Sequence, residues 1–170
     1  GIEWERPIGL TVFREDGTVG LNVNCGVRVS GGYTRVNKQK SLRLYARKAY
    51  TPDSGVFEYS FWDGLRGSHT GTPVAFSDTV LLRGGSNNEG NAIFTTPALL
   101  MLLEGTDLDR PAISPVVEYI NGRYYGIVML LEDYDVDFFL ANYGVPEEYL
   151  TTLKGTAPEL YRTTGWYLDD

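Results

Sequence analysis

The chain has 170 residues, of which 42% are hydrophobic and 22% charged, a composition typical of a globular protein rather than a disordered tail or a collagen-like repeat. Its formal net charge of −7 argues against binding to a nucleic-acid backbone, which requires clustered Lys and Arg. A single Cys excludes an internal disulfide, and a single His argues against a histidine-rich zinc site or a His-assisted nucleophile. No apolar run approaches the roughly 20 residues of a membrane helix, so no membrane insertion is predicted.

The first part of the chain has the alternation of β-strands. Residues 8–14 are predicted to form a strand, and Asp16-Gly17 is a two-residue hairpin signal that joins it to the next one. Along residues 21–29 the odd positions are apolar and the even positions are polar or glycine, which predicts one buried and one solvated face. Cys25 lies on the apolar face, which favours a small core residue over a reactive thiol.

A third strand is predicted over residues 40–47, where Leu42, Leu44 and Ala46 share one face. Lys40 has the same parity as these residues. Its side chain therefore either extends to solvent from the start of the strand or points into a cleft, and the spacing alone favours solvent.

The middle of the chain contains an aromatic stretch at residues 57–62 and then a Gly/Ser/Thr-rich loop with His69, for which we expect no role. Residues 76–83 are predicted to form another strand, which ends in Arg83 and is followed by the turn Gly84-Gly85-Ser86-Asn87-Asn88. The amides of such a turn could hold an anion. Two glycines alone, however, favour an ordinary strand-to-helix turn.

The predicted helix of residues 98–104 has Thr96 as its N-cap, Pro97 at its first position and Gly105 at its end. An alternative is a helix that begins near Asn91 and is kinked by Pro97. We then predict a hairpin of residues 116–120 and 124–131 around Asn121-Gly122, which suits a type I′ turn. The second of these strands is apolar at both parities, so we expect it to be central and covered on both sides.

Asp135 is predicted to cap a helix over residues 136–143, which Gly144 ends, and residues 146–150 suggest one more helical turn. The pattern predicts an α+β fold, an antiparallel sheet packed by two or three helices, with residues 1–170 as a single domain. The expected core includes Val23, Cys25, Val27, Leu42, Leu44, Ile127 and Met129.

Four segments, read in order, resemble the CotH family of atypical protein kinases, which takes its name from spore coat protein H. These segments are Trp4-Glu-Arg-Pro7 with the following strand, Gly26-Val-Arg-Val-Ser-Gly-Gly32 with Lys40-Ser-Leu-Arg-Leu-Tyr45, Leu82-Arg-Gly-Gly-Ser-Asn87, and Asn121-Gly122 with Tyr125-Gly126, Glu132 and Tyr143-Gly144. The resemblance extends over about residues 4–155. It implies part of an atypical protein-kinase fold, and it makes residues 1–170 the amino-terminal part of a longer kinase domain.

The resemblance implies that ATP and Mg²⁺ are the cofactors of the parent Ser/Thr kinase and that its substrate is a protein of a spore coat or cell surface. Lys40 would point at the ATP phosphates, because phosphoryl transfer needs cations that neutralise the transferred group. Gly31 and Gly32 would form a flexible lid beside the nucleotide. Arg83 and Asn87 would lie at the cleft.

Glu132 either pairs with Lys40 or is a surface acid, a choice that strand parity does not settle. The sequence also departs from the family pattern. Residues 129–131 are apolar where the family tends to have Asn-Leu-Arg. The family's Asp-Trp-x-x-Asn-Asn and Asp-x-Asp blocks, which supply the catalytic and metal-binding aspartates, are not present, and Asp169-Asp170 does not match them. We therefore expect no phosphoryl transfer by this chain alone, and its catalytic and metal-binding residues stay unassigned.

Three functions remain open at this stage. The first is the nucleotide-binding part of a CotH-like kinase, and the second is a non-catalytic interaction module of a coat or cell surface. The third is a carbohydrate-binding β domain in which Tyr59, Trp62 and Tyr125 stack on a sugar.

Overall fold

The structure is a computed structural model that describes residues 4–52, 54–67, 69–88, 92–103, 106–151, 153–154 and 161–162. Its strands are β1 (Arg6–Phe13), β2 (Val19–Ser30), β3 (Ser41–Tyr45), β4 (Thr79–Arg83), β5 (Ile113–Ile120), β6 (Arg123–Glu132), β7 (Leu153–Lys154) and β8 (Tyr161–Arg162). Its helices are η1 (Tyr33–Val36), η2 (Ser86–Asn88), α1 (Thr95–Met101), α2 (Val136–Tyr143) and η3 (Glu147–Tyr149), the η elements being short 3₁₀ helices. None of the described helices is long and apolar enough to cross a membrane.

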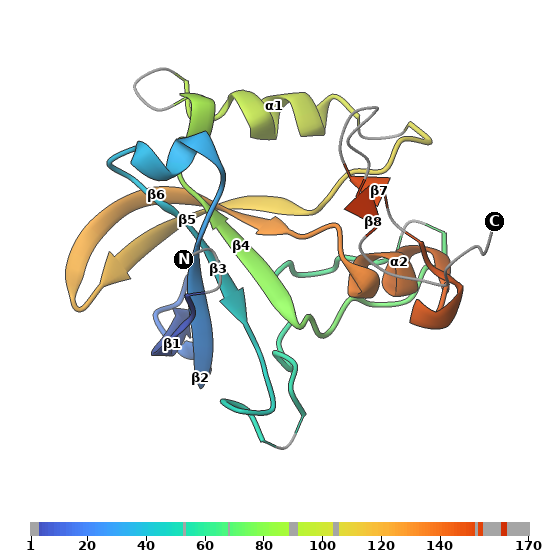
Figure 1. The fold of residues 1–170 in the computed structure, drawn as a ribbon, viewed down its shortest axis with the longest axis horizontal. Coiled ribbons are helices and arrows are strands. Elements are labelled where there is room, and N and C mark those ends of the chain that lie inside the picture. The colour runs from blue at the N-terminus through green and yellow to red at the C-terminus, as the bar shows by residue number, and fades with distance from the viewer. Residues whose placement is uncertain are drawn as a thin grey trace. The chain divides into compact units, whose positions relative to one another are not determined.

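The chain divides into two compact units, one of residues 1–63 and 75–133 and one of residues 64–74 and 134–170. The first unit holds a six-stranded antiparallel sheet with the order β1-β2-β3-β4-β6-β5, and α1 lies beside the end of this sheet (Figure 1). The second unit holds α2, η3 and the small β7–β8 pair. The predicted α+β class with an antiparallel sheet is confirmed.

The turn residues correctly predicted the positions of the β1–β2 and β5–β6 hairpins of the large sheet. Asn121 and Gly122 have φ of 51° and 74°, the two left-handed residues that a type I′ turn between β5 and β6 requires. The β1–β2 turn differs from the prediction. Arg14 N donates to Thr18 O at 2.8 Å, so the loop closed by this pair has three residues rather than two, with Gly17 at φ 83° in the last position.

The core lies on one face of the sheet. Cys25, Leu44 and Val80, from three adjacent strands, have at most 2% of their surface exposed, and Phe57 covers them from the loop after β3. Val23 and Val27 are half-buried against this cluster. The alternation predicted for β2 and β3 is therefore confirmed around Cys25 and Leu44, although Leu42, like Val23 and Val27, is only half-buried and Val29 on the same face is exposed.

Ile127 does not belong to the core, since 38% of its surface is exposed, and its predicted burial is wrong. The reason is the length of β4, which pairs with β6 only over Met129–Glu132. Between Ile127 and the turn the β5–β6 hairpin is two-stranded, so β6 is covered on both sides only in its second half. Residues 128–132 are all buried.

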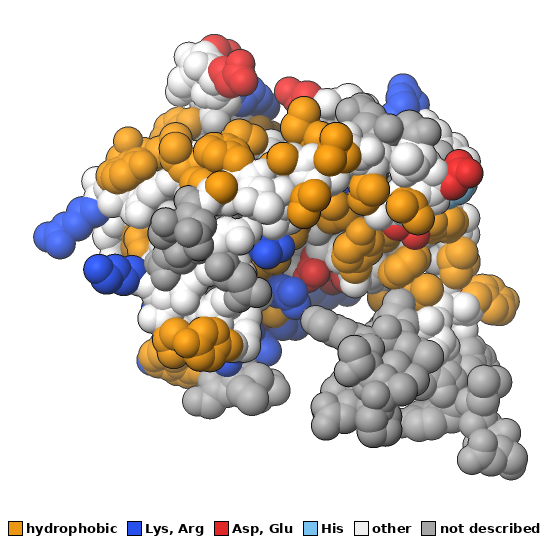
Figure 2. All heavy atoms as spheres, turned by 90° about the horizontal axis from the view of Figure 1, so that it is seen from above, with side chains coloured by type: hydrophobic (Ala, Val, Ile, Leu, Met, Phe, Trp, Pro, Cys, Tyr) orange, Lys and Arg blue, Asp and Glu red, His pale blue; other side chains and the backbone are white. Residues whose placement is uncertain are grey.

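The predicted start of α1 is also wrong. Phe94 rather than Thr96 occupies the N-cap position, without a side-chain hydrogen bond, and Pro97 lies in the first turn, where its missing N–H costs nothing. The predicted end at Gly105 lies outside the described residues. Leu99, Met101 and Leu102 expose 59%, 65% and 77% of their surface, and apolar side chains are prominent in the view from above (Figure 2).

In the second unit, Asp135 and Gly144 have the predicted roles at the two ends of α2. An Asp135 carboxylate oxygen accepts a hydrogen bond from Phe138 N at 3.1 Å, and Gly144 ends the helix with φ 69°. His69 is exposed, and its ring stacks on Tyr143 with 4.5 Å between centroids.

Candidate functional site

Two glycine-containing turns meet at one end of the sheet in the first unit. The segment that contains η1 and leads into β3 lies against the turn that follows β4. Gly84 N donates to Ser41 Oγ at 3.1 Å, and Gly85 N donates to Gln39 Oε1 at 3.3 Å. A Cβ at position 84 would lie 2.9 Å from Gln39 O, so the close approach requires glycine there. We call residues 31–41 and 84–86 together the glycine junction.

Lys40 is held within this junction. Its ammonium group donates to the carbonyl oxygens of Arg35, at 2.7 Å, and of Asn37. Its backbone N donates to the hydroxyl of Tyr125 on β6 at 2.6 Å. Lys40 thereby ties η1 and β6 to the start of β3. Because an ammonium group has three N–H donors, one remains for a ligand.

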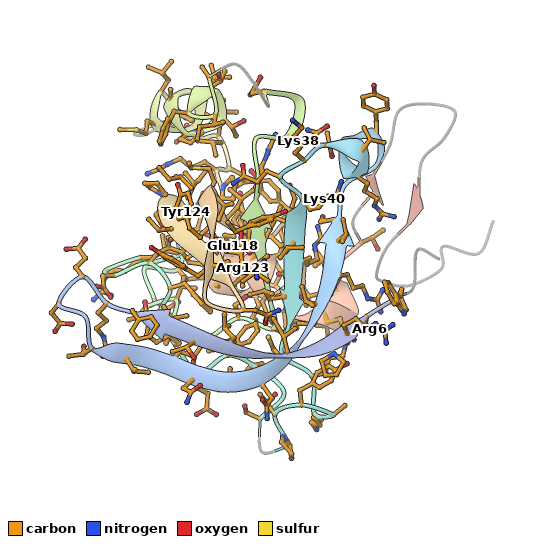
Figure 3. All side chains as sticks on the ribbon, turned by 90° about the vertical axis from the view of Figure 1, so that its left-hand side faces the viewer. Arg6, Lys38, Lys40, Glu118, Arg123 and Tyr124 are labelled. Carbon is orange, nitrogen blue, oxygen red and sulfur yellow. The ribbon has the colours of Figure 1, made fainter. Side chains whose placement is uncertain are left out.

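The structure brings four of the predicted site residues to this end of the sheet: Gly31, Gly32, Lys40 and Arg83. Gly31 has φ 104°, and both glycines are exposed immediately before η1. Arg83 is the last residue of β4, half-buried and opposite Met129 of β6. Figure 3 shows Lys38 and Lys40 on the stretch between η1 and β3. The side chain of Asn87 lies outside the described part of the structure.

Glu132 is not part of the junction. Its register position is level with Leu44 and Val80, further along the sheet than Lys40. A Glu132 carboxylate oxygen accepts a hydrogen bond from Ala112 N at 2.9 Å, and burial raises the pKa of this carboxyl. The structure therefore does not form the Lys40–Glu132 ion pair, and Glu132 is not a surface acid either, because 8% of its surface is exposed.

A second buried acid, Glu118 on β5, was missed by the sequence reasoning. It is 9% exposed, and Oε2 is buried without a hydrogen-bond partner among the described residues. Burial raises the pKa of this carboxyl to about 7. The register places Glu118 opposite Gly126, and Figure 3 shows it with Arg123 and Tyr124 of the same hairpin. Its parity with Val116 was the one available signal.

The face of the sheet opposite the core carries a cluster of arginines. Arg28 on β2 lies directly opposite Arg43 on β3, and Arg83 follows on β4. Glu5 lies 2.9 Å from Arg28 and 3.0 Å from Arg47. The alternation of β2 and β3 predicted a polar face here, but not that arginines from different strands would meet.

The described residues contain no group of three or more His, Cys, Asp or Glu side chains that could hold a metal ion. Asp133 pairs with Arg43 at 3.0 Å, and Asp135 caps α2. Asp169 and Asp170 lie outside the described residues.

The aromatic side chains considered for sugar binding are not displayed on an open sheet face. Tyr59, Trp62 and Tyr125 are each half-buried. Trp62 packs against the core cluster, and the Tyr125 hydroxyl accepts the hydrogen bond from Lys40 N.

The fold and the junction define an α+β protein with a six-stranded antiparallel sheet. The sequence model of the family described as CotH kinase protein matches residues 27–165. The chain belongs to this family, as the order of its motifs indicated. A comparison with curated proteins found no match.

Proposed function

We propose that this chain is the nucleotide-binding part of a CotH-like protein kinase and that the glycine junction receives the phosphate end of ATP. The observation that carries the proposal is the meeting of two glycine turns beside two cationic side chains, Lys40 and Arg83. Exposed backbone at Gly31 and Gly32 allows a ligand to approach closely. Family membership supports a kinase-related role.

The residues present fit the nucleotide better than they fit its metal. Lys40 has one N–H left for a phosphate oxygen, and Arg83, half-buried at the end of β4, has no ion-pair or hydrogen-bond partner for its side chain among the described residues. When bound, ATP with Mg²⁺ would supply the phosphoryl group for transfer to a protein substrate. In this chain Lys40 would orient the phosphates and hold η1 over them. We assign no residue to the metal and expect no transfer by this chain alone.

The proposal is tested by titrating Mg-ATP into the purified chain by calorimetry, with radiolabel transfer to a generic protein substrate measured in parallel. We expect ATP binding without transfer. Lys40→Ala is expected to weaken binding by about tenfold, the usual effect of losing one hydrogen bond to a charged group. Lys48→Ala, which changes an exposed lysine after β3, is the matched control.

Absence of ATP binding by the wild-type chain would contradict the proposal. Label transfer abolished by a substitution within the chain would overturn the expected inactivity and direct attention to Glu132, Asp133 and Asp135 as metal ligands.

A non-catalytic interaction module of a coat or cell surface is the second candidate. The β5–β6 hairpin favours it, because Tyr119 and Tyr124 each expose 62% of their surface and pack edge to face at 5.8 Å, beside Val117 at 57%. Aromatic pairs of this kind are frequent at protein interfaces. The test is sedimentation of the chain with coat or cell-wall fractions. A Tyr119→Ser/Tyr124→Ser variant that sediments as the wild type does would count against this function.

A further inference from the structure

The arginine cluster opposite the core is unusual for a chain with a net charge of −7. Arg28 and Arg43 occupy directly opposed positions of β2 and β3, where like charges destabilise a sheet. Arg83 lies diagonally across from Arg43 on β4, because Arg43 is opposite Leu81, and such diagonal positions are about 7 Å apart. We call Arg28, Arg43, Arg47 and Arg83 the arginine face.

Part of this face has a structural role. Glu5, whose side chain is 11% exposed, lies between Arg28 and Arg47 and accepts hydrogen bonds from both. Both guanidinium groups also lie over the Tyr45 ring, at 5.2 Å and 4.6 Å from its centroid. The contacts with the Glu5 carboxylate and the Tyr45 ring therefore give Arg28 and Arg47 a structural role.

The other two arginines are less well accounted for. Arg43 donates from Nη2 to Asp133, which leaves its Nε buried without a partner among the described residues. The side chain of Arg83 is half-buried and forms no ion pair or hydrogen bond within the described part of the chain. Two carboxylates, those of Glu5 and Asp133, thus face four guanidinium groups. The excess positive charge therefore lies at Arg28 and Arg47, which have one carboxylate between them, and at Arg83, which has none among the described residues.

We propose that Arg43 and Arg83 hold the phosphate groups of the nucleotide against the arginine face, on the side of the sheet opposite the core. The inference rests on the proposed nucleotide-binding function and assigns the phosphates to specific donors. Guanidinium groups bind phosphate oxygens through paired N–H donors. Two arginines at diagonal positions of adjacent strands, whose backbone positions are about 7 Å apart, suit neighbouring phosphates of one polyphosphate chain. The side chain of Arg43 is 30% exposed, so a ligand reaches it without unfolding of the sheet.

The location agrees with the glycine junction. Arg83 is the last residue of β4 and is followed directly by Gly84 and Gly85, whose amides are bonded to Ser41 and Gln39. A phosphate chain that begins at the junction would therefore continue along β3 and β4 toward Arg43. In this arrangement Lys40 orients the phosphate at the junction, and the arginines carry most of the charge compensation beyond it.

The experiment measures the affinity of the purified chain for ATP, for inorganic pyrophosphate and for adenosine by calorimetry at low ionic strength. The variants are Arg83→Ala, Arg43→Lys and the control Arg123→Ala, which removes an exposed arginine of the β5–β6 hairpin (Figure 3). Arg83→Ala is the main test, because it breaks no described contact and so is expected to fold. Arg43→Lys retains the charge but removes the paired donors.

We expect Arg83→Ala and Arg43→Lys each to weaken ATP and pyrophosphate binding by about tenfold or more, with Arg123→Ala unchanged. If both variants bind ATP as tightly as the wild type does, the assignment to the arginine face is overturned while the proposed function stands. If the wild type binds pyrophosphate through Arg83 and binds ATP no more tightly than pyrophosphate, the site is an anion site only and the nucleotide assignment fails. If it binds neither ligand, both proposals fail.

Discussion

Replacing Glu118 by Gln should make the folded protein more stable at alkaline pH and change little at acidic pH. The residue is 9% exposed, and its Oε2 has no partner among the described residues, so its charge is poorly compensated in the folded state. Gln has the same shape as Glu but does not ionise. The variant therefore isolates the cost of the buried charge.

The magnitude follows from the two pKa values. Burial raises the pKa of Glu118 from 4.5 to about 7. Below pH 4.5 the carboxyl is protonated in both the folded and the unfolded protein, so its burial does not penalise folding. As the pH rises from 4.5 through about 7, the unfolded protein ionises first, and the free energy of unfolding falls. The full difference corresponds to about 3 kcal/mol of unfolding free energy. We expect Glu118→Gln to be more stable than the wild type by about 3 kcal/mol at about pH 8 and by less than about 1 kcal/mol at about pH 5.

The assay is urea unfolding of both proteins at the two pH values, followed by tyrosine and tryptophan fluorescence. Glu15→Gln, an exposed acid in the β1–β2 turn, is the matched control and should show no pH-dependent difference. The buried acid Glu132 is present in both proteins, so its own titration cancels in the comparison. A stability difference between Glu118→Gln and the wild type that is the same at both pH values would refute this reasoning.

Three further outcomes are expected. Glu132→Ala should lower the free energy of unfolding by about 2 kcal/mol, because Ala112 N is left buried without an acceptor. Glu132→Gln should lower it less, and equal losses of the two variants in urea unfolding would contradict this prediction. Asp135→Ala should destabilise α2 by about 1 kcal/mol, measured as faster amide hydrogen exchange from Phe138 onward, whereas Asp135→Asn should preserve the cap. Unchanged exchange in the alanine variant would contradict this prediction. Cys25 should react with a thiol reagent only in the unfolded protein, because burial raises the pKa of its thiol to about 12 and leaves none of its side-chain surface exposed. Equally fast labelling with and without urea would disprove its burial.

The family and the short-range structure follow from the sequence alone. The type I′ turn at Asn121-Gly122 and the ends of α2 at Asp135 and Gly144 depend on residues within one turn of each other, so local conformational preference determines them. The alternation around Cys25 and Leu44 likewise identified the buried face, because the period of a strand fixes which side chains share a face.

The remaining features depend on which strands pair and for how long. The short β4 leaves Ile127 exposed. The register of β5 and β6 places Glu118 opposite Gly126, where its Oε2 is buried without a hydrogen-bond partner among the described residues. The meeting of Arg28 with Arg43 depends on the register of β2 and β3, and the bonds from Lys40 to η1 and Tyr125 depend on how the chain returns to the sheet. Strand alternation in the sequence predicts the face of the sheet on which a residue lies, but it does not predict which residue lies beside it on the next strand. Only the tertiary structure therefore decided which charges lie together and which are buried alone.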